Sequence, residues 1–170
     1  MIQTAGAQKK RQVSFSSYNS AGFVAGKLPV AFAAQTENGI AFKNWFIGAG
    51  FGIDDYYLKT LPLFGAVKKI IPLKNNGFFL YANVGSNLIA KNKTQKTNWS
   101  TIYTKNGFYA DAGVGYLIKT GRQGHLFFSA GNTVKRMEEV EQYPDTYGMP
   151  GFRDTVRKFS RLSFKVGFQF

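Results

Sequence analysis

The chain ends with the twelve residues Phe159-Ser-Arg-Leu-Ser-Phe-Lys-Val-Gly-Phe-Gln-Phe170, most of which alternate between apolar and polar or small side chains. From Leu162 to Phe170 every second residue is apolar, and the residues between them are polar or small. Because successive side chains of a β-strand point to opposite faces, this segment predicts a strand with one apolar face. Such strands occur both in membrane β-barrels and in half-buried sheets of soluble proteins.

The same period of two recurs along the chain, with turn-forming residues between the segments. It predicts eight strands, over about residues 13–26, 28–42, 45–56, 61–73, 78–89, 105–119, 125–135 and the C-terminal segment. No stretch shows a competing helical period. At 170 residues we expect one domain, an all-β, eight-stranded antiparallel up-and-down transmembrane barrel over residues 13–170.

The expected connections differ in length. Those after the second, fourth and sixth strands are short, whereas those after the third, fifth and seventh are mostly longer, and residues 90–104 and 136–155 form two long loops. Short turns at one rim and longer loops at the other are typical of outer-membrane barrels. The pattern therefore places both termini and the short turns on the periplasmic side.

The polar face of these strands is rich in glycine and carries few charges. Glycine suits the crowded interior of an eight-stranded barrel, whereas on a water-facing surface it would only weaken the strands. Buried charges need partners, so the charges of this face are expected to form a network inside the lumen: Lys68, Asp111, Arg161 and Lys165. The alternative is a soluble, lipocalin-like ligand-binding barrel, in which the apolar face points inward.

The chain is strongly basic, with 22 Lys and Arg against 9 Asp and Glu and a net charge of +13. The basic residues cluster in expected loops and rims and do not form one stripe with aromatic residues, which argues against nucleic acid as a partner. At those rims they are placed to contact the phosphates of lipopolysaccharide. There is no cysteine, which excludes disulfides and thiol chemistry.

The first twelve residues differ from the rest. Ala5-Gly6-Ala7 is similar to a signal-peptidase site, although no basic and long apolar regions precede it. We expect cleavage before Gln8 and interpret residues 1–12 as a residual signal or N-terminal tail.

Several motifs resemble the small outer-membrane β-barrel proteins of Bacteroidota, of the eight-stranded OmpA/OmpX type. They are the run Asn38-Gly-Ile-Ala-Phe-Lys-Asn-Trp-Phe-Ile-Gly-Ala-Gly-Phe-Gly-Ile-Asp54, then Leu61-Pro-Leu-Phe64, Gly107–Tyr116, Leu126–Gly131 and the final phenylalanine. The resemblance implies a cell outer-membrane location. It also implies that Phe170, with Phe168, is the signal read by the β-barrel assembly machinery.

The sequence offers little for catalysis. His125 is the one histidine, and Ser129 lies too far along the same strand to reach it easily. We expect no enzyme activity, no metal and no cofactor. The function predicted instead is a structural or accessory role, binding other outer-membrane proteins or lipopolysaccharide, with a narrow small-solute channel as an alternative. In the two long loops, the aromatic residues are the candidate contacts: Trp99, Tyr103, Tyr143 and Tyr147.

Overall fold

The structure, a computed structural model, describes residues 13–26, 29–55, 59–89, 95–97, 100–121, 124–143 and 151–170. All regular elements are strands: β1 Val13–Ala25, β2 Ala31–Phe42, β3 Trp45–Asp55, β4 Lys59–Pro72, β5 Asn76–Ile89, β6 Gln95–Thr97, β7 Ser100–Lys119, β8 His125–Tyr143 and β9 Gly151–Gln169. Among the described residues there is no helix long and apolar enough to span a membrane.

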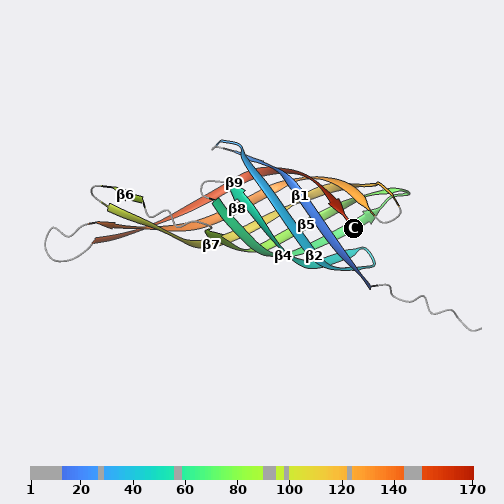
Figure 1. Cartoon of the computed structure of the whole chain (residues 1–170), viewed down its shortest axis with the longest axis horizontal. Helices are drawn as coiled ribbons and strands as arrows, with labels where there is room; N and C mark the ends of the chain where they lie inside the picture. Colours follow the sequence, from blue (N-terminus) through green and yellow to red (C-terminus); the bar gives the residue numbers. More distant parts are fainter. Residues whose placement is uncertain are drawn as a thin grey trace, which may run out of the picture.

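Eight of these strands close into an antiparallel up-and-down barrel (Figure 1). Neighbours in sequence pair with each other, β5 pairs with β7, and β1 pairs with β9 to complete the ring. The short β6 lies outside the ring and pairs only with the start of β7. The predicted fold class is therefore confirmed. The period of two along each strand decides which side chains face the lumen.

Three strands continue beyond the barrel and form what we call the extension sheet: residues 100–106 of β7, 136–143 of β8 and 151–160 of β9. The last pairing of β9 with β1 is Leu162 with Ala25, and the last pairing of β7 with β5 is Gly107 with Asn87. Above these points the three strands pair only with one another and with β6. Figure 1 shows them as a twisted sheet that projects from one end of the barrel.

The prediction of two long loops, at residues 90–104 and 136–155, is thus wrong for most of the described residues in them. Residues 136–143 and 151–155 are strand, and so are 95–97 and 100–104. The charged run Glu138–Glu141 breaks the apolar alternation, which suggested a loop. The inner face of the extension sheet is partly covered, since Met137 and Glu139 are buried. Charged residues nevertheless occupy both of its faces, so it lacks the apolar alternation that reveals the barrel strands.

The end of the barrel opposite the extension sheet carries the tight connections. Residues 43–44 join β2 to β3, residues 73–75 join β4 to β5, and residues 120–124 join β7 to β8. The C-terminus lies toward this end in Figure 1, and β1 begins there at Val13. Residues 1–12, interpreted as a signal remnant or tail, lie outside the described residues.

Candidate functional site

Aromatic side chains fill the half of the lumen that is nearer to the tight connections. Tyr18 lies at the centre, with its ring 4.9 Å from that of Phe46 and 5.7 Å from that of Phe127. Phe79 packs against Phe127 at 5.8 Å between ring centroids. Further buried rings and apolar side chains complete the cluster: Phe64, Tyr81, Tyr109 and Leu117. Edge-to-face ring contacts at these distances are favourable and leave little free volume.

Three carboxylates lie above and among these rings, and each is paired with a lysine from another strand. Asp111 of β7 accepts hydrogen bonds from Lys165 of β9, from Ser163 at 3.2 Å and from Thr133 at 3.1 Å. Both Asp111 and Lys165 are buried. This cluster contains two of the four lumen charges expected from the sequence.

The other two expected charges have different surroundings. Lys68 is buried, but its ammonium lies 2.7 Å from the carboxylate of Glu37 on β2. Glu37 also accepts a hydrogen bond from the Asn83 amide at 3.0 Å, and the Lys68 ammonium lies 4.7 Å from the centre of the Tyr18 ring. Arg161 is buried at the lumen side of β9. A buried lysine loses its hydration, and contacts with a carboxylate and with ring faces offset part of that cost.

The third pair crosses the barrel. Lys135 of β8 donates to the carboxylate of Asp54 on β3, at 2.6 Å to Oδ1, and to the hydroxyl of Thr60 at 2.9 Å. β3 and β8 lie four strands apart around the eight-stranded ring, so this pair joins opposite walls. Neither Asp54 nor Lys135 was among the lumen charges expected from the sequence. Sequence separation hides such pairs, because the two residues are 81 positions apart.

Together the ring cluster and the three ion pairs occupy the described lumen from the end with the tight connections to the level of Lys135. Removing water from the pairs makes the lumen a rigid core in which every charge depends on its partner. Such an interior supports the barrel wall and leaves little space between these buried side chains. The small-channel alternative is therefore disfavoured by the packing of Tyr18, Phe79 and their neighbours.

The outside of the barrel has the opposite character. Large apolar side chains are exposed on every wall of the barrel, for example Phe51 at 60%, Val84 at 54% and Phe164 at 54%. Monomeric proteins in water rarely expose contiguous apolar patches of more than a few hundred Å². An apolar belt around a polar interior is instead the arrangement of a barrel in lipid. The lipocalin-like alternative requires the reverse arrangement of faces and is incompatible with this structure.

The two C-terminal phenylalanines lie on this outer surface. Phe168 is 56% exposed and Phe170 is 62% exposed. The backbone of Phe170 exchanges two hydrogen bonds with Ser17, from the amide of Ser17 at 2.8 Å and to its carbonyl at 3.1 Å. The terminal residue therefore pairs with β1 through its backbone, while its ring remains free to contact another protein or lipid.

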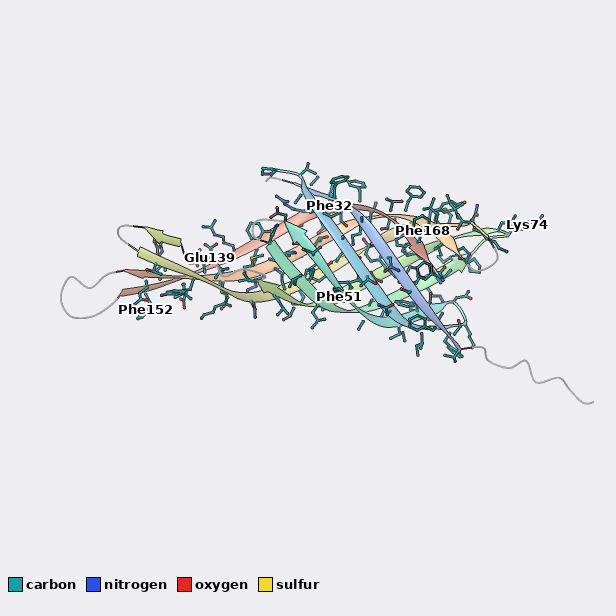
Figure 2. The ribbon with its side chains drawn as sticks, in the orientation of Figure 1. Phe32, Phe51, Lys74, Glu139, Phe152 and Phe168 are labelled. Carbon is teal, nitrogen blue, oxygen red and sulfur yellow. The ribbon has the colours of Figure 1, made fainter. Side chains whose placement is uncertain are left out.

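The extension sheet carries exposed residues of several kinds. Phe152 is 65% exposed, Tyr103 is 47% exposed and Val156 is 44% exposed, all on the face that continues the outer surface of the barrel. On the opposite face Arg157 donates to Glu139 at 2.6 Å. Figure 2 shows Phe152 near the tip of the sheet and Lys74 at the far end of the barrel.

Of the four aromatic residues expected to bind a partner, Tyr103 lies in β7 and is exposed. Tyr143 ends β8. Trp99 and Tyr147 lie outside the described residues. Phe152 was not selected from the sequence. Its position opposite Gln142 on a continuous strand, which only the structure reveals, is what presents its side chain.

The described residues contain no cluster of three or more side chains that could hold a metal ion. His125 begins β8 and pairs with Gln169 and Lys119, at the end of the barrel away from the extension sheet. Ser129 lies on the same strand and pairs with Lys165. The arrangement of a nucleophile, a base and an orienting group needed for hydrolysis is not formed by these residues.

In sequence, the chain matches no protein-family model and no curated protein. In structure it is similar to Neisserial surface protein A, NspA, with a TM-score of 0.60. The likeness covers 93% of this chain and 97% of that one, at 10% identical residues. It shows a common fold.

Proposed function

We propose that the protein is an integral barrel of the outer membrane, without catalytic activity, that presents the extension sheet as a docking surface for another surface protein. The apolar outer surface and the likeness to a Neisserial surface protein support this location. The motif resemblance to Bacteroidota barrels, including the run Asn38–Asp54, supports it as well. The filled lumen leaves the outer surfaces as the places where function can reside.

One observation carries the docking role, namely the open edge of β9. Between Gly151 and Val156, β9 pairs with β8 on one side and with no second strand among the described residues on the other. An unpaired strand edge exposes a row of backbone donors and acceptors to which an extended segment of a partner adds. The exposed side chains of Phe152 and Val156 lie beside this edge and supply apolar contacts.

The same rim has a second candidate ligand in lipopolysaccharide. Lys105, Arg136 and Lys158 are exposed on the outer face where the extension sheet leaves the barrel, and Arg136 pairs directly with Lys158 across β8 and β9. Glu138 lies opposite Lys105 and 4.0 Å from Arg136, so the three cations outnumber the one carboxylate among them and suit phosphate groups. These contacts would fix the depth of the barrel in the membrane while the sheet above remains free.

A photo-crosslinking experiment tests the docking role. A photoreactive residue is placed at Phe152 or, as the control, at Lys74, and the protein is expressed in its own outer membrane. We expect one adduct of defined mass from position 152 and none from position 74. In the chain without a photoreactive residue, replacing residues 138–156 by Asn-Gly, which joins Met137 to Arg157, should abolish co-purification of the captured partner and leave the barrel folded. Adducts of equal yield from both positions would contradict the proposal.

A further inference from the structure

A block of four polar side chains interrupts the apolar outer surface on β1 and β2. We define the polar block as Ser17, Asn19, Thr36 and Asn38. In the register of the two strands, Ser17 lies opposite Asn38 and Asn19 lies opposite Thr36, so the four side chains form two adjacent rows on one face. That face is the outer one, because Tyr18 and Glu37 between them point into the lumen. On it Asn38 is exposed and Asn19 and Thr36 are half-buried, whereas Ser17 is buried beneath its neighbours.

The polar block is surrounded by apolar side chains on every side. Along the strands, Phe15 and Ile40 lie toward the tight-turn end and are 70% and 52% exposed. Phe23 and Phe32 lie toward the other end and are 57% and 52% exposed. To the sides, Asn19 pairs with Phe168 of β9, and Thr36 pairs with Phe51 of β3. Figure 2 labels Phe32, Phe51 and Phe168, three members of this apolar surround.

The block lies within the height of the membrane rather than at its surface. Phe15 and Phe23 are eight residues apart on β1, which corresponds to about 26 Å along the strand and roughly 20 Å along the normal of a tilted barrel. The apolar band of such barrels is about 25 Å tall. The polar block therefore faces hydrocarbon in a monomer, although amides and hydroxyls lose their hydrogen bonds to water there.

The internal hydrogen bonds of the block satisfy it only in part. Thr36 donates to Asn19 at 2.7 Å, Asn19 donates to Ser17 at 3.1 Å, and Asn38 donates to Thr36 at 3.5 Å. Each carboxamide has two N–H donors and a carbonyl oxygen with two lone pairs. The Asn38 side chain is exposed, and its bond to Thr36 is at the limit of hydrogen-bond distance. The block therefore keeps capacity for a partner inside the membrane.

We propose that this partner is a second copy of the chain, bound through the polar block about a twofold axis along the membrane normal. The surface at such an axis must complement itself. Amides and hydroxyls meet this condition because each both donates and accepts, and the block contains no charge that would repel its copy. The inference rests on the membrane location in the proposed function and is independent of the extension sheet.

The surface beside the block allows close approach. The next row contains Ala21 opposite Ala34, and a groove of about 700 Å³ runs over these small residues between Phe51 and Phe168. Small residues let transmembrane elements approach, and polar side chains then bond across the contact.

Disulfide trapping tests the contact directly, because the native chain has no cysteine. Asn38→Cys and the control Val84→Cys are reconstituted separately in phosphatidylcholine–phosphatidylglycerol liposomes at low protein-to-lipid ratio and then oxidised. Val84 is 54% exposed on β5, nearly opposite β1 in the ring, and lies in the same row of paired residues, through Gly65 and Ala49, as Asn38. We expect most of the Asn38→Cys protein to form a disulfide dimer, and at least fivefold less of the Val84→Cys protein.

A second measurement removes the hydrogen-bonding groups without removing the surface. In energy transfer between labelled copies, Asn19→Leu with Asn38→Leu should weaken association at least tenfold, whereas Val84→Leu should leave it unchanged. Equal disulfide yields at positions 38 and 84, or unchanged association after both leucine substitutions, would overturn the proposal. So would trapping of a different protein at position 38 in native membranes. Failure of the protein to float with liposomes would instead contradict the membrane location.

Discussion

The two halves of β9 have the same extended backbone but differ in how their side chains are exposed. From Arg161 to Gln169 the side chains alternate between a buried polar set and an exposed apolar set, whereas from Gly151 to Lys158 all are exposed. The first half is one wall of a closed barrel, whereas the second half is exposed on both of its faces. The change occurs within two residues, at the point where β1 stops pairing with β9.

This difference shows which property of the sequence marks the membrane. Strand content does not, because the strand continues unchanged beyond the barrel. Burial of charge does: the lumen half places Arg161 and Lys165 inside, and the extension half leaves Arg153 and Lys158 in water. Substitutions that exchange these environments should therefore have large effects in one half and small effects in the other.

The largest effect is expected in the lumen. Asp111→Leu removes the carboxylate and leaves the Lys165 ammonium buried, which should lower the free energy of unfolding by about 3–5 kcal/mol. The matched control is Glu138→Gln in the extension sheet, where the side chains of Arg136 and Glu138 are about half exposed and 4.0 Å apart. Its loss should stay below about 1 kcal/mol. Urea unfolding in liposomes measures both.

A double variant separates the missing pair from simple loss of packing. Adding Lys165→Met to Asp111→Leu removes the uncompensated charge and should recover a large part of the lost free energy of unfolding. If the double variant is as unstable as Asp111→Leu, packing around Asp111 is the dominant contribution and the ion pair is not.

The next effect compares two positions on the same face of β9. Phe164→Arg places a charge toward lipid and should cost about 2–4 kcal/mol on folding into liposomes. Val156→Arg, eight residues earlier on the same face, places the charge in water and should change the free energy by less than about 0.5 kcal/mol. Equal costs at the two positions would mean that the membrane boundary does not lie between Val156 and Phe164.

The barrel half could be predicted from the sequence because its alternation has a physical cause on both faces. Leu162–Phe170 revealed the outward apolar set, and the same parity placed Lys68, Asp111 and Lys165 in the lumen. The partners Glu37 and Asp54 could not be paired in this way, since strand register and barrel closure decide which residues meet across the lumen. The extension sheet was missed because charged residues occupy both of its faces and leave no apolar period, as Glu138–Glu141 illustrates.

A smaller effect is expected from the space available at two glycines. A Cβ at Gly115 would lie 2.2 Å from the ring of buried Phe79 and 2.7 Å from the carbonyl oxygen of Phe128, so Gly115→Ala should cost about 1–3 kcal/mol. At Gly65, on the outer surface, the nearest atom would be 3.9 Å away. Gly65→Ala should leave stability unchanged or raise it by less than about 1 kcal/mol. Equal costs would show that the lumen is less tightly packed than the ring contacts indicate.

The smallest effect on stability is expected at the C-terminus. There the substitution should lower the amount of folded protein in the outer membrane more than it lowers the stability of the refolded barrel. Phe170→Ala keeps both backbone hydrogen bonds to Ser17, and the ring that it removes is 62% exposed, so the refolded barrel should lose less than about 1 kcal/mol. If the ring is read during insertion, the amount of folded protein in the outer membrane should nevertheless fall several-fold. Tyr116→Ala is a control, since it removes a ring near the same rim that contacts Phe78 at 4.9 Å and has no proposed role in recognition. A fall in membrane assembly that matches the loss of stability in both variants would make Phe170 a structural residue only.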